Sequence, residues 1–135
     1  MFEIQFSPYK DNTIVSCGIK QISIWTIMGN TMSRKKGLFG QVKDMQTMLC
    51  MAFSSQPDVY YCGTMNGAIY VWKQLKLEEI IPEAHDGPIN VMTVISDGFV
   101  TSGRDGKIRL WNSTFNPLST IDLKDCIRFA DGLFI

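Results

Sequence analysis

The side chains best suited to catalysis in this sequence are His85, its only histidine, and the acidic residues near it. His85 lies in the segment AHDGP, and Asp105 lies further along the chain in SGRDG. A histidine oriented by an aspartate is the general base that activates a serine or cysteine nucleophile. No serine or cysteine stands in the G-x-S-x-G turn that carries such a nucleophile in many hydrolases. A His85–Asp105 dyad would therefore have nothing to activate, and we do not expect an enzyme.

Metal and cofactor sites are equally poorly supported by the residue pattern. One histidine and no clustered carboxylates or thiols make a poor ligand set for zinc. The glycine-rich segments GTMNG and SGRDG contain neither of the phosphate-binding patterns, GxxxxGK[ST] and GxGxxG, and we interpret both as turns. We expect no cofactor. The cysteines are far apart, form no CxxC pair and lie in apolar runs, which favours buried free thiols over disulfides or metal ligands; they are Cys17, Cys50, Cys62 and Cys126.

The charge balance limits the kinds of partner. Thirteen basic and thirteen acidic residues cancel, so no overall field attracts nucleic acid or an anionic membrane. No apolar run approaches 18 residues and no signal peptide is visible at the N-terminus, which together predict a cytoplasmic protein. One local basic run, Arg34, Lys35 and Lys36, has two interpretations. It is either the solvated face of an edge strand or a contact patch for a partner.

The elements that must position these side chains form an internal repeat. The stretches NTIVSCGIKQISIWT (12–26), DVYYCGTMNGAIYVWK (58–73) and VTSGRDGKIRLWN (100–112) share one order of features. Each has a β-rich apolar run, a glycine, a short polar turn and an alternating run that closes on Trp25, Trp72 or Trp111. The intervals between these tryptophans are 47 and 39 residues. Four-stranded propeller blades repeat about every 40–45 residues, so this spacing predicts blades.

Alternating apolar residues and turn signals predict strands throughout. The Asp-Gly pairs at residues 97–98 and 105–106 indicate tight hairpins in which both central residues have positive φ. Four antiparallel strands per unit make a propeller blade. We therefore predict an all-β fold, a partial β-propeller, with blades at about 1–40, 45–82 and 86–123 and the start of a fourth at 124–135. The expected strands cover residues 2–6, 13–17, 21–26, 31–39, 46–54, 59–63, 68–73, 75–81, 89–95, 99–103, 107–112 and 118–123.

The third unit resembles a WD repeat in its polar residues as well as its spacing. In that family a His before the first strand, a Ser or Thr in the second, an Asp in the next turn and a Trp in the third strand form a buried hydrogen-bonded chain. The matching residues here are His85, Thr101, Asp105 and Trp111. A buried tryptophan needs one acceptor for its N–H, and a threonine hydroxyl both accepts and donates, which supports this interpretation. The resemblance implies that Trp111 has a structural role.

The other two units depart from this pattern. In the second unit Asn66 and Cys62 stand where Asp105 and Thr101 stand in the third. The first unit has a shorter hairpin with no acidic turn residue. We expect the full network only in the third unit, while Trp25 and Trp72 are expected to be core residues of their blades.

A longer resemblance narrows the family. The strings SIWTIMGNTMSRKKGLFG, MQTMLCMAF, YYCGTMNGAIYVWK, AHDGPINVM and GFVTSGRDGKIRLW are similar to the echinoderm microtubule-associated protein-like family, from about residue 14 to residue 111. This resemblance implies tandem seven-bladed propellers that bind tubulin or microtubules as a cytoskeletal or axonemal scaffold. An alternative function is a WD-repeat scaffold for other proteins, in a ubiquitin ligase or a signalling complex. The resemblance identifies no tubulin-binding residue in this chain.

Three blades cannot close a propeller ring, and their outer faces would expose apolar residues. We therefore expect this chain to be a segment of a longer protein whose remaining blades cover those faces. The alternative is a short chain that is completed by partner chains.

Overall fold

The computed structural model of the chain describes residues 3–38 and 44–126, apart from the side chains of residues 125 and 126. In the described part the chain forms three four-stranded antiparallel sheets followed by a one-turn helix, α1 (Leu123–Cys126). The prediction of an all-β fold with three four-stranded units is confirmed. The strands are β1 (Glu3–Phe6), β2 (Thr13–Gly18), β3 (Gln21–Met28), β4 (Thr31–Lys36), β5 (Met48–Phe53), β6 (Val59–Thr64), β7 (Ile69–Lys73), β8 (Lys76–Ile81), β9 (Ile89–Ile95), β10 (Gly98–Gly103), β11 (Lys107–Asn112) and β12 (Pro117–Asp122).

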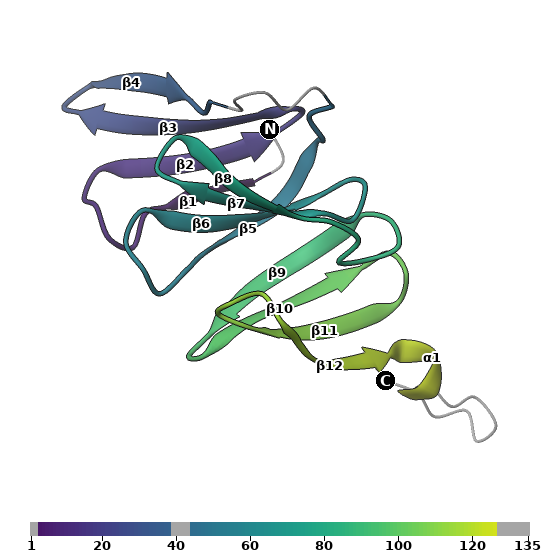
Figure 1. Cartoon of the computed structure of the whole chain (residues 1–135). Coiled ribbons are helices and arrows are strands. Elements are labelled where there is room, and N and C mark those ends of the chain that lie inside the picture. The colour runs from purple at the N-terminus through teal and green to yellow at the C-terminus, as the bar shows by residue number, and fades with distance from the viewer. Residues whose placement is uncertain (1–2, 39–43, 127–135) are drawn as a thin grey trace, which may run out of the picture.

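Each sheet is ordered as the chain runs, so that every strand pairs with its neighbour in sequence. The sheets β1–β4, β5–β8 and β9–β12 follow one another as successive layers, with β4 at one end of the molecule and β12 at the other (Figure 1). The first strand of the middle sheet, β5, packs beside β2 on one side and β9 on the other. This stacking of successive antiparallel sheets is the arrangement of blades in a propeller.

Two hydrophobic clusters fill the spaces between the sheets. The first joins residues of the first sheet, including Val15 and Ile22, to Trp72 and other residues of the second. The second joins Val71 and its neighbours to Trp111 and other residues of the third sheet. Successive side chains of a strand point to opposite faces, so Val71 and Trp72 belong to different clusters. Each of these two tryptophans therefore packs against the sheet that precedes it.

An aromatic ring stands across the strand from each of these tryptophans. Trp72 is stacked on Tyr60 with ring centroids 6.5 Å apart, and Trp111 is stacked on Phe99 at 5.9 Å. The paired residues lie directly opposite each other in the strand register. Aromatic cross-strand pairs of this kind stabilise a sheet beyond the burial of their area.

The two Asp-Gly turns differ from the expectation that both central residues have positive φ. At the β10–β11 turn only Gly106 does, at φ 78°, and its N–H donates to the carbonyl of Gly103, as in a type I turn that ends in a left-handed glycine. At the β9–β10 turn Gly98 already belongs to the strand, where it pairs with Ile95. A Cβ at Gly98 would collide with the carbonyl oxygen of Trp111, so close backbone approach accounts for this glycine.

Some predicted boundaries were also wrong. The strand expected to reach residue 39 ends at Lys36, because Gly37 is buried against Ile22 and Trp72 while the backbone of Leu38 bonds to Leu75 and Leu77 of the next sheet. Residue 39 and the predicted strand start at residue 2 lie outside the described residues. Of the predicted fourth blade at 124–135, residues 127–135 also lie outside them, and residues 124–126 belong to α1.

Candidate functional site

The four polar residues singled out in the third unit form one continuous chain of hydrogen bonds. The indole Nε1 of Trp111 lies 2.9 Å from Oγ1 of Thr101, which lies 2.7 Å from Nε2 of His85. The Nδ1 atom of His85 lies 3.0 and 3.1 Å from the two carboxylate oxygens of Asp105. Thr101 is fully buried and His85 is only 3% exposed, so these bonds lie in the protein interior.

The chemistry of the four groups sets the direction of every bond. An ionised Asp105 can only accept, so Nδ1 of His85 carries a proton, and in this tautomer of the neutral ring Nε2 is an acceptor. The hydroxyl of Thr101 then donates to His85 and accepts the N–H of Trp111. Each buried donor in this chain therefore has one acceptor, and the network is satisfied throughout.

The carboxylate of Asp105 also holds two backbone groups. It accepts hydrogen bonds of 3.0 Å from the N–H of Asp86 and from the N–H of Lys107. Burial alone would raise the pKa of Asp105, but the hydrogen bonds from His85 and from these two N–H groups outweigh that effect and lower its pKa below the ordinary value. The ionised carboxylate is thus the stable form in the fold.

Two glycines let the segment that carries His85 approach the neighbouring turns. The N–H of His85 donates to the carbonyl of Gly67 in the β6–β7 turn, and Gly67 has φ 89°. A Cβ at Gly67 would collide with the carbonyl oxygen of His85. A Cβ at Gly103 would lie 2.8 Å from Nδ1 of the His85 ring. The N–H of Arg104 donates to the carbonyl of Pro88. The connection between the second and third sheets is therefore bonded to a turn of each.

This arrangement leaves little chemical freedom to the imidazole. Both ring nitrogens of His85 are occupied, and the hydroxyl of Thr101 is buried against Trp111. A general base needs a nitrogen within reach of the proton that it abstracts, and this ring has none free. The network binds the loop that carries His85 to the third sheet.

The first sheet keeps part of the same arrangement, which the sequence analysis did not anticipate. Nε1 of Trp25 lies 2.9 Å from Oγ of Ser16, as Trp111 does from Thr101. Ser16 stands nine residues before Trp25, and Thr101 ten before Trp111, because the first hairpin is one residue shorter. Aligning the hairpins on their tryptophans, with a gap of one residue in the shorter turn, would have identified Ser16.

The second sheet uses its equivalent residues differently. Asn66 accepts a hydrogen bond of 2.8 Å from the hydroxyl of Thr64 and one of 3.2 Å from the N–H of Ala68. These bonds stabilise the β6–β7 turn itself. Cys62, at the position of Thr101, is buried in the apolar cluster between the first two sheets. The second unit therefore closes its own turn and holds no bond from this position to a neighbouring loop.

The basic run on β4 is divided by its contacts. Arg34 lies over the ring of Trp25, with its Cζ 5.3 Å from the ring centroid, and its nitrogens donate to Ser23 at 3.0 Å and Gln21 at 2.9 Å. Lys35 and Lys36 are exposed on the outer strand. The run therefore combines an arginine bound to its own sheet with two exposed cationic side chains.

Three of the four cysteines are buried free thiols, and the side chain of Cys126 is not described. Burial raises the pKa of Cys50 to about 12 and also raises the pKa of Cys62, so neither thiol ionises near neutral pH. Within the described residues no group of three potential ligands could hold a metal ion. The described part also has no helix with the length and apolar character needed to cross a membrane.

Successive four-stranded antiparallel sheets, with a His-Thr-Asp-Trp network in one of them, define this chain as part of a WD-repeat β-propeller. Solved structures share the fold at low sequence identity. The structure of U3-55K has a TM-score of 0.71 and 17% identity, over 87% of this chain and 38% of that one. The C-terminal WD40 domain of Sif2 has a TM-score of 0.72 and 14% identity, over 92% and 37%.

Residues 1–130 match the family of the first β-propeller of echinoderm microtubule-associated protein, and the chain belongs to this family. It is 31% identical to human echinoderm microtubule-associated protein-like 4 over 137 residues, which is 90% of the chain and 14% of that protein. It is 30% identical to mouse echinoderm microtubule-associated protein-like 1 over 93% of the chain and 16% of that protein. Human echinoderm microtubule-associated protein-like 2 is 29% identical over 89% of the chain and 19% of that protein. The chain thus spans less than a fifth of the length of these relatives. The resemblance found in the sequence is confirmed.

Proposed function

We propose that this chain is part of a non-enzymatic microtubule-associated protein whose propeller binds tubulin or microtubules as a scaffold of the cytoplasmic or axonemal cytoskeleton. The observation that carries this proposal is the family match over residues 1–130, since the relatives in that family are named for microtubule association.

The polar network supports a structural role in place of a catalytic one. His85 is enclosed between two turns and has both ring nitrogens bonded, and Asp105 is held by backbone N–H groups. A residue that is fully occupied in the resting fold stabilises that fold, and its removal should affect stability before any activity.

The outer faces of the molecule support further blades from the same protein. Phe6 is 69% exposed on the face of the first sheet that carries Trp25, and Val91 is 57% exposed on the opposite end face, that of the third sheet. In the two spaces between sheets the corresponding faces are covered by a neighbour. We therefore propose blade limits near 1–40, 45–82 and 86–123, with other blades of the same protein covering both end faces.

The test is co-sedimentation of the full natural protein with stabilised microtubules across a salt series. Pelleting that saturates and weakens as salt rises is the expected result, because screened charges contribute less to binding. A folded protein that stays in the supernatant at low salt would contradict direct binding to the polymer. Binding to soluble tubulin would then be measured next. The alternative function, a scaffold for other proteins, would be tested beside it.

A further inference from the structure

The space between the first and second sheets (the first seam) and the space between the second and third sheets (the second seam) are lined by residues at equivalent positions. The first seam is nearly closed, whereas the second is open. Ile24 and Val71 each precede the tryptophan of their strand, and Val15 and Tyr61 each follow the residue paired with it. These residues line a cavity of about 40 Å³ at the first seam and a groove of about 500 Å³ at the second. The strand pairing also differs here, because β7 and β8 have a bulge between Val71 and Trp72 whereas β3 and β4 pair without a shift.

At the first seam the turns bond to each other across the gap. Lys10 of the β1–β2 turn forms an ion pair of 2.7 Å with Asp58 of the second sheet. The hydroxyl of Tyr9 donates to the carbonyl of Ser54 across the same gap, whereas the hydroxyl of Tyr60 donates to the carbonyl of Gln74 within the second unit. These bonds hold the surrounding turns together and leave room for little more than a water molecule.

At the second seam the corresponding groups are missing. Phe99 stands at the position of Tyr60 and has no hydroxyl to donate. The turn of the second sheet that faces the gap carries Ser55 and Gln56, which have no charge to pair with Asp97 at the position of Asp58. Among the described residues no ion pair crosses this end of the seam.

Phe115 forms one apolar side of the open groove. Its ring lies edge-on to Tyr61 with centroids 5.3 Å apart, and 5.7 Å from Phe99. Its backbone has φ 66°, and Asn112 holds the turn by accepting from the N–H groups of Thr114 and Asn116. An aromatic side chain held by a turn of this kind keeps an apolar surface in place before any partner arrives.

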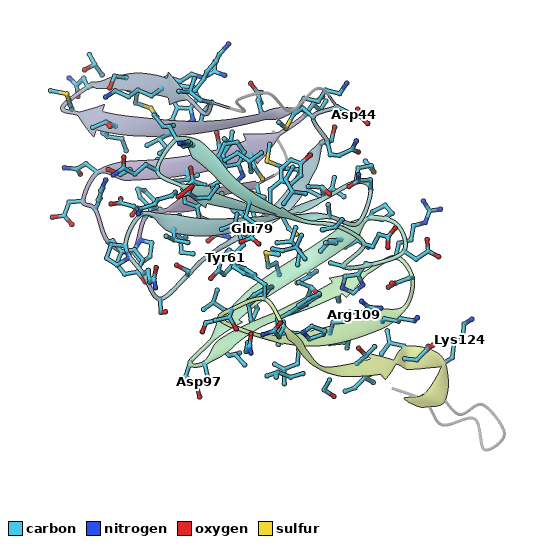
Figure 2. The ribbon with its side chains drawn as sticks, in the orientation of Figure 1. Asp44, Tyr61, Glu79, Asp97, Arg109 and Lys124 are labelled. Carbon is cyan, nitrogen blue, oxygen red and sulfur yellow. The ribbon has the colours of Figure 1, made fainter. Side chains whose placement is uncertain are left out.

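Two carboxylates supply the charge of the groove. Glu78 and Glu79 of β8 are exposed and line it, with Lys73 as the one basic lining residue. Glu79 pairs in register with Val71, whereas the equivalent partner of Ile24 in the first sheet is Lys35. Figure 2 shows Glu79 and Tyr61 close together on the second sheet. The open seam is thus acidic beside an apolar floor.

We propose that this groove is a docking site for an extended segment of another protein in which an arginine or lysine stands two residues from an apolar side chain. In an extended chain, residues two apart point to the same side. The apolar side chain contacts Val71 and Phe115 while the basic one meets Glu78 and Glu79. The volume is within the range of about 300–1,000 Å³ that binding pockets have. This inference goes beyond microtubule binding and does not depend on it.

The test is fluorescence polarisation with the full natural protein and a labelled pool of nine-residue peptides. In the pool an arginine and a leucine are separated by one serine, and the other positions are randomised. Control pools carry glutamate for the arginine or serine for the leucine. We expect saturable binding of the first pool and at least about tenfold weaker binding of both controls, because each loses one of the two contacts.

Variants assign that binding to the groove. The double substitution Glu78→Lys and Glu79→Lys should weaken it by about tenfold or more, and Lys73→Glu should strengthen it, a gain that misfolding cannot produce. The matched control is Asp44→Lys, an exposed carboxylate at the other end of the second sheet (Figure 2), which should leave binding unchanged. Microtubule pelleting of all variants is measured in parallel, so that failure of one function is separable from failure of the other.

Three results would overturn the proposal. The first is equal binding of the arginine and glutamate pools, and the second is unchanged binding by the double variant. The third is a crosslink that shows a segment of the protein's own chain in the groove. It would be detected with a photoreactive phenylalanine analogue at Ser113, which lines the groove.

Discussion

Asp105 and Asn66 occupy the same position in equivalent turns of successive sheets, six residues before Trp111 and Trp72. Only the Asp105 side chain accepts hydrogen bonds from outside its own turn. Each accepts the N–H two residues later, that of Lys107 at 3.0 Å or that of Ala68 at 3.2 Å. The carboxylate also accepts from His85 and from the backbone of Asp86. One acidic residue thus converts a local turn into a connection between sheets.

The substitution Asp105→Ala should lower the free energy of unfolding by about 1–3 kcal/mol, because it leaves His85 and two N–H groups without their acceptor. Asn66→Ala is the matched control and should cost less than about 1 kcal/mol, since Asn66 is exposed and its removal breaks only bonds within its own turn. Denaturant unfolding of both variants measures the difference. Equal losses would mean that the connection to His85 contributes nothing to stability.

Acidification should remove the contribution of Asp105. Its pKa is lowered in the fold, so its ionised form stabilises the protein above the unfolded-state value of about 3.9, and this stabilisation is lost as the pH falls through the folded-state pKa. The difference in unfolding free energy between wild type and Asp105→Asn should be constant above about pH 5 and shrink toward about pH 2. A difference that stays constant over this range would contradict the lowered pKa.

Thr101→Val should destabilise the protein by about 1–3 kcal/mol, since the methyl group replaces the hydroxyl that both Trp111 and His85 use. Ser16→Ala removes the equivalent partner of Trp25, which is only half-buried in this structure, and should cost less. Thermal unfolding monitored by tryptophan fluorescence compares the two. A larger loss for Ser16→Ala would show that the first sheet depends more strongly on this bond.

The buried thiols should resist modification until the protein unfolds. Cys17, Cys50 and Cys62 are at most 4% exposed, and burial raises the pKa of Cys50 to about 12, so the reactive thiolate is scarce at pH 8. Iodoacetamide labelling read by peptide mass spectrometry, with and without denaturant, checks this. Rapid labelling of these three peptides in the native protein would mean that the seams open readily.

Charge reversal of Lys35 and Lys36 together to glutamate should weaken microtubule pelleting at low salt, if the exposed part of the β4 basic run contacts the polymer. We expect a loss of about 0.5–1 kcal/mol per side chain, which is typical of exposed charges. Lys20→Glu, in the exposed β2–β3 turn, is the control. Unchanged pelleting of the double variant would exclude these residues from the contact and leave them as a solvated edge.

Most of the fold could be predicted because its strands and its repeat depend on local sequence patterns. Alternation of apolar residues, together with turn signals, located all twelve strands within a few residues, and the three tryptophans set the repeat. The errors occurred where backbone approach decided the outcome. Gly98 marks close contact with Trp111, and the backbone of residue 38 bonds to the next sheet, which no local pattern indicates.

The sequence by itself determined the repeat, the strands, the family and the identity of the residues in the His85 network, because each depends on residue type and on spacing along the chain. Tertiary structure decided the relations between sheets. It brought Gly67 against His85, placed Arg34 over Trp25, and left the seam beside Glu79 open while Lys10 and Asp58 help to close the other. These contacts join backbone groups or side chains of different hairpins or strands, and their energies depend on distances that exist only once the strands and sheets have packed.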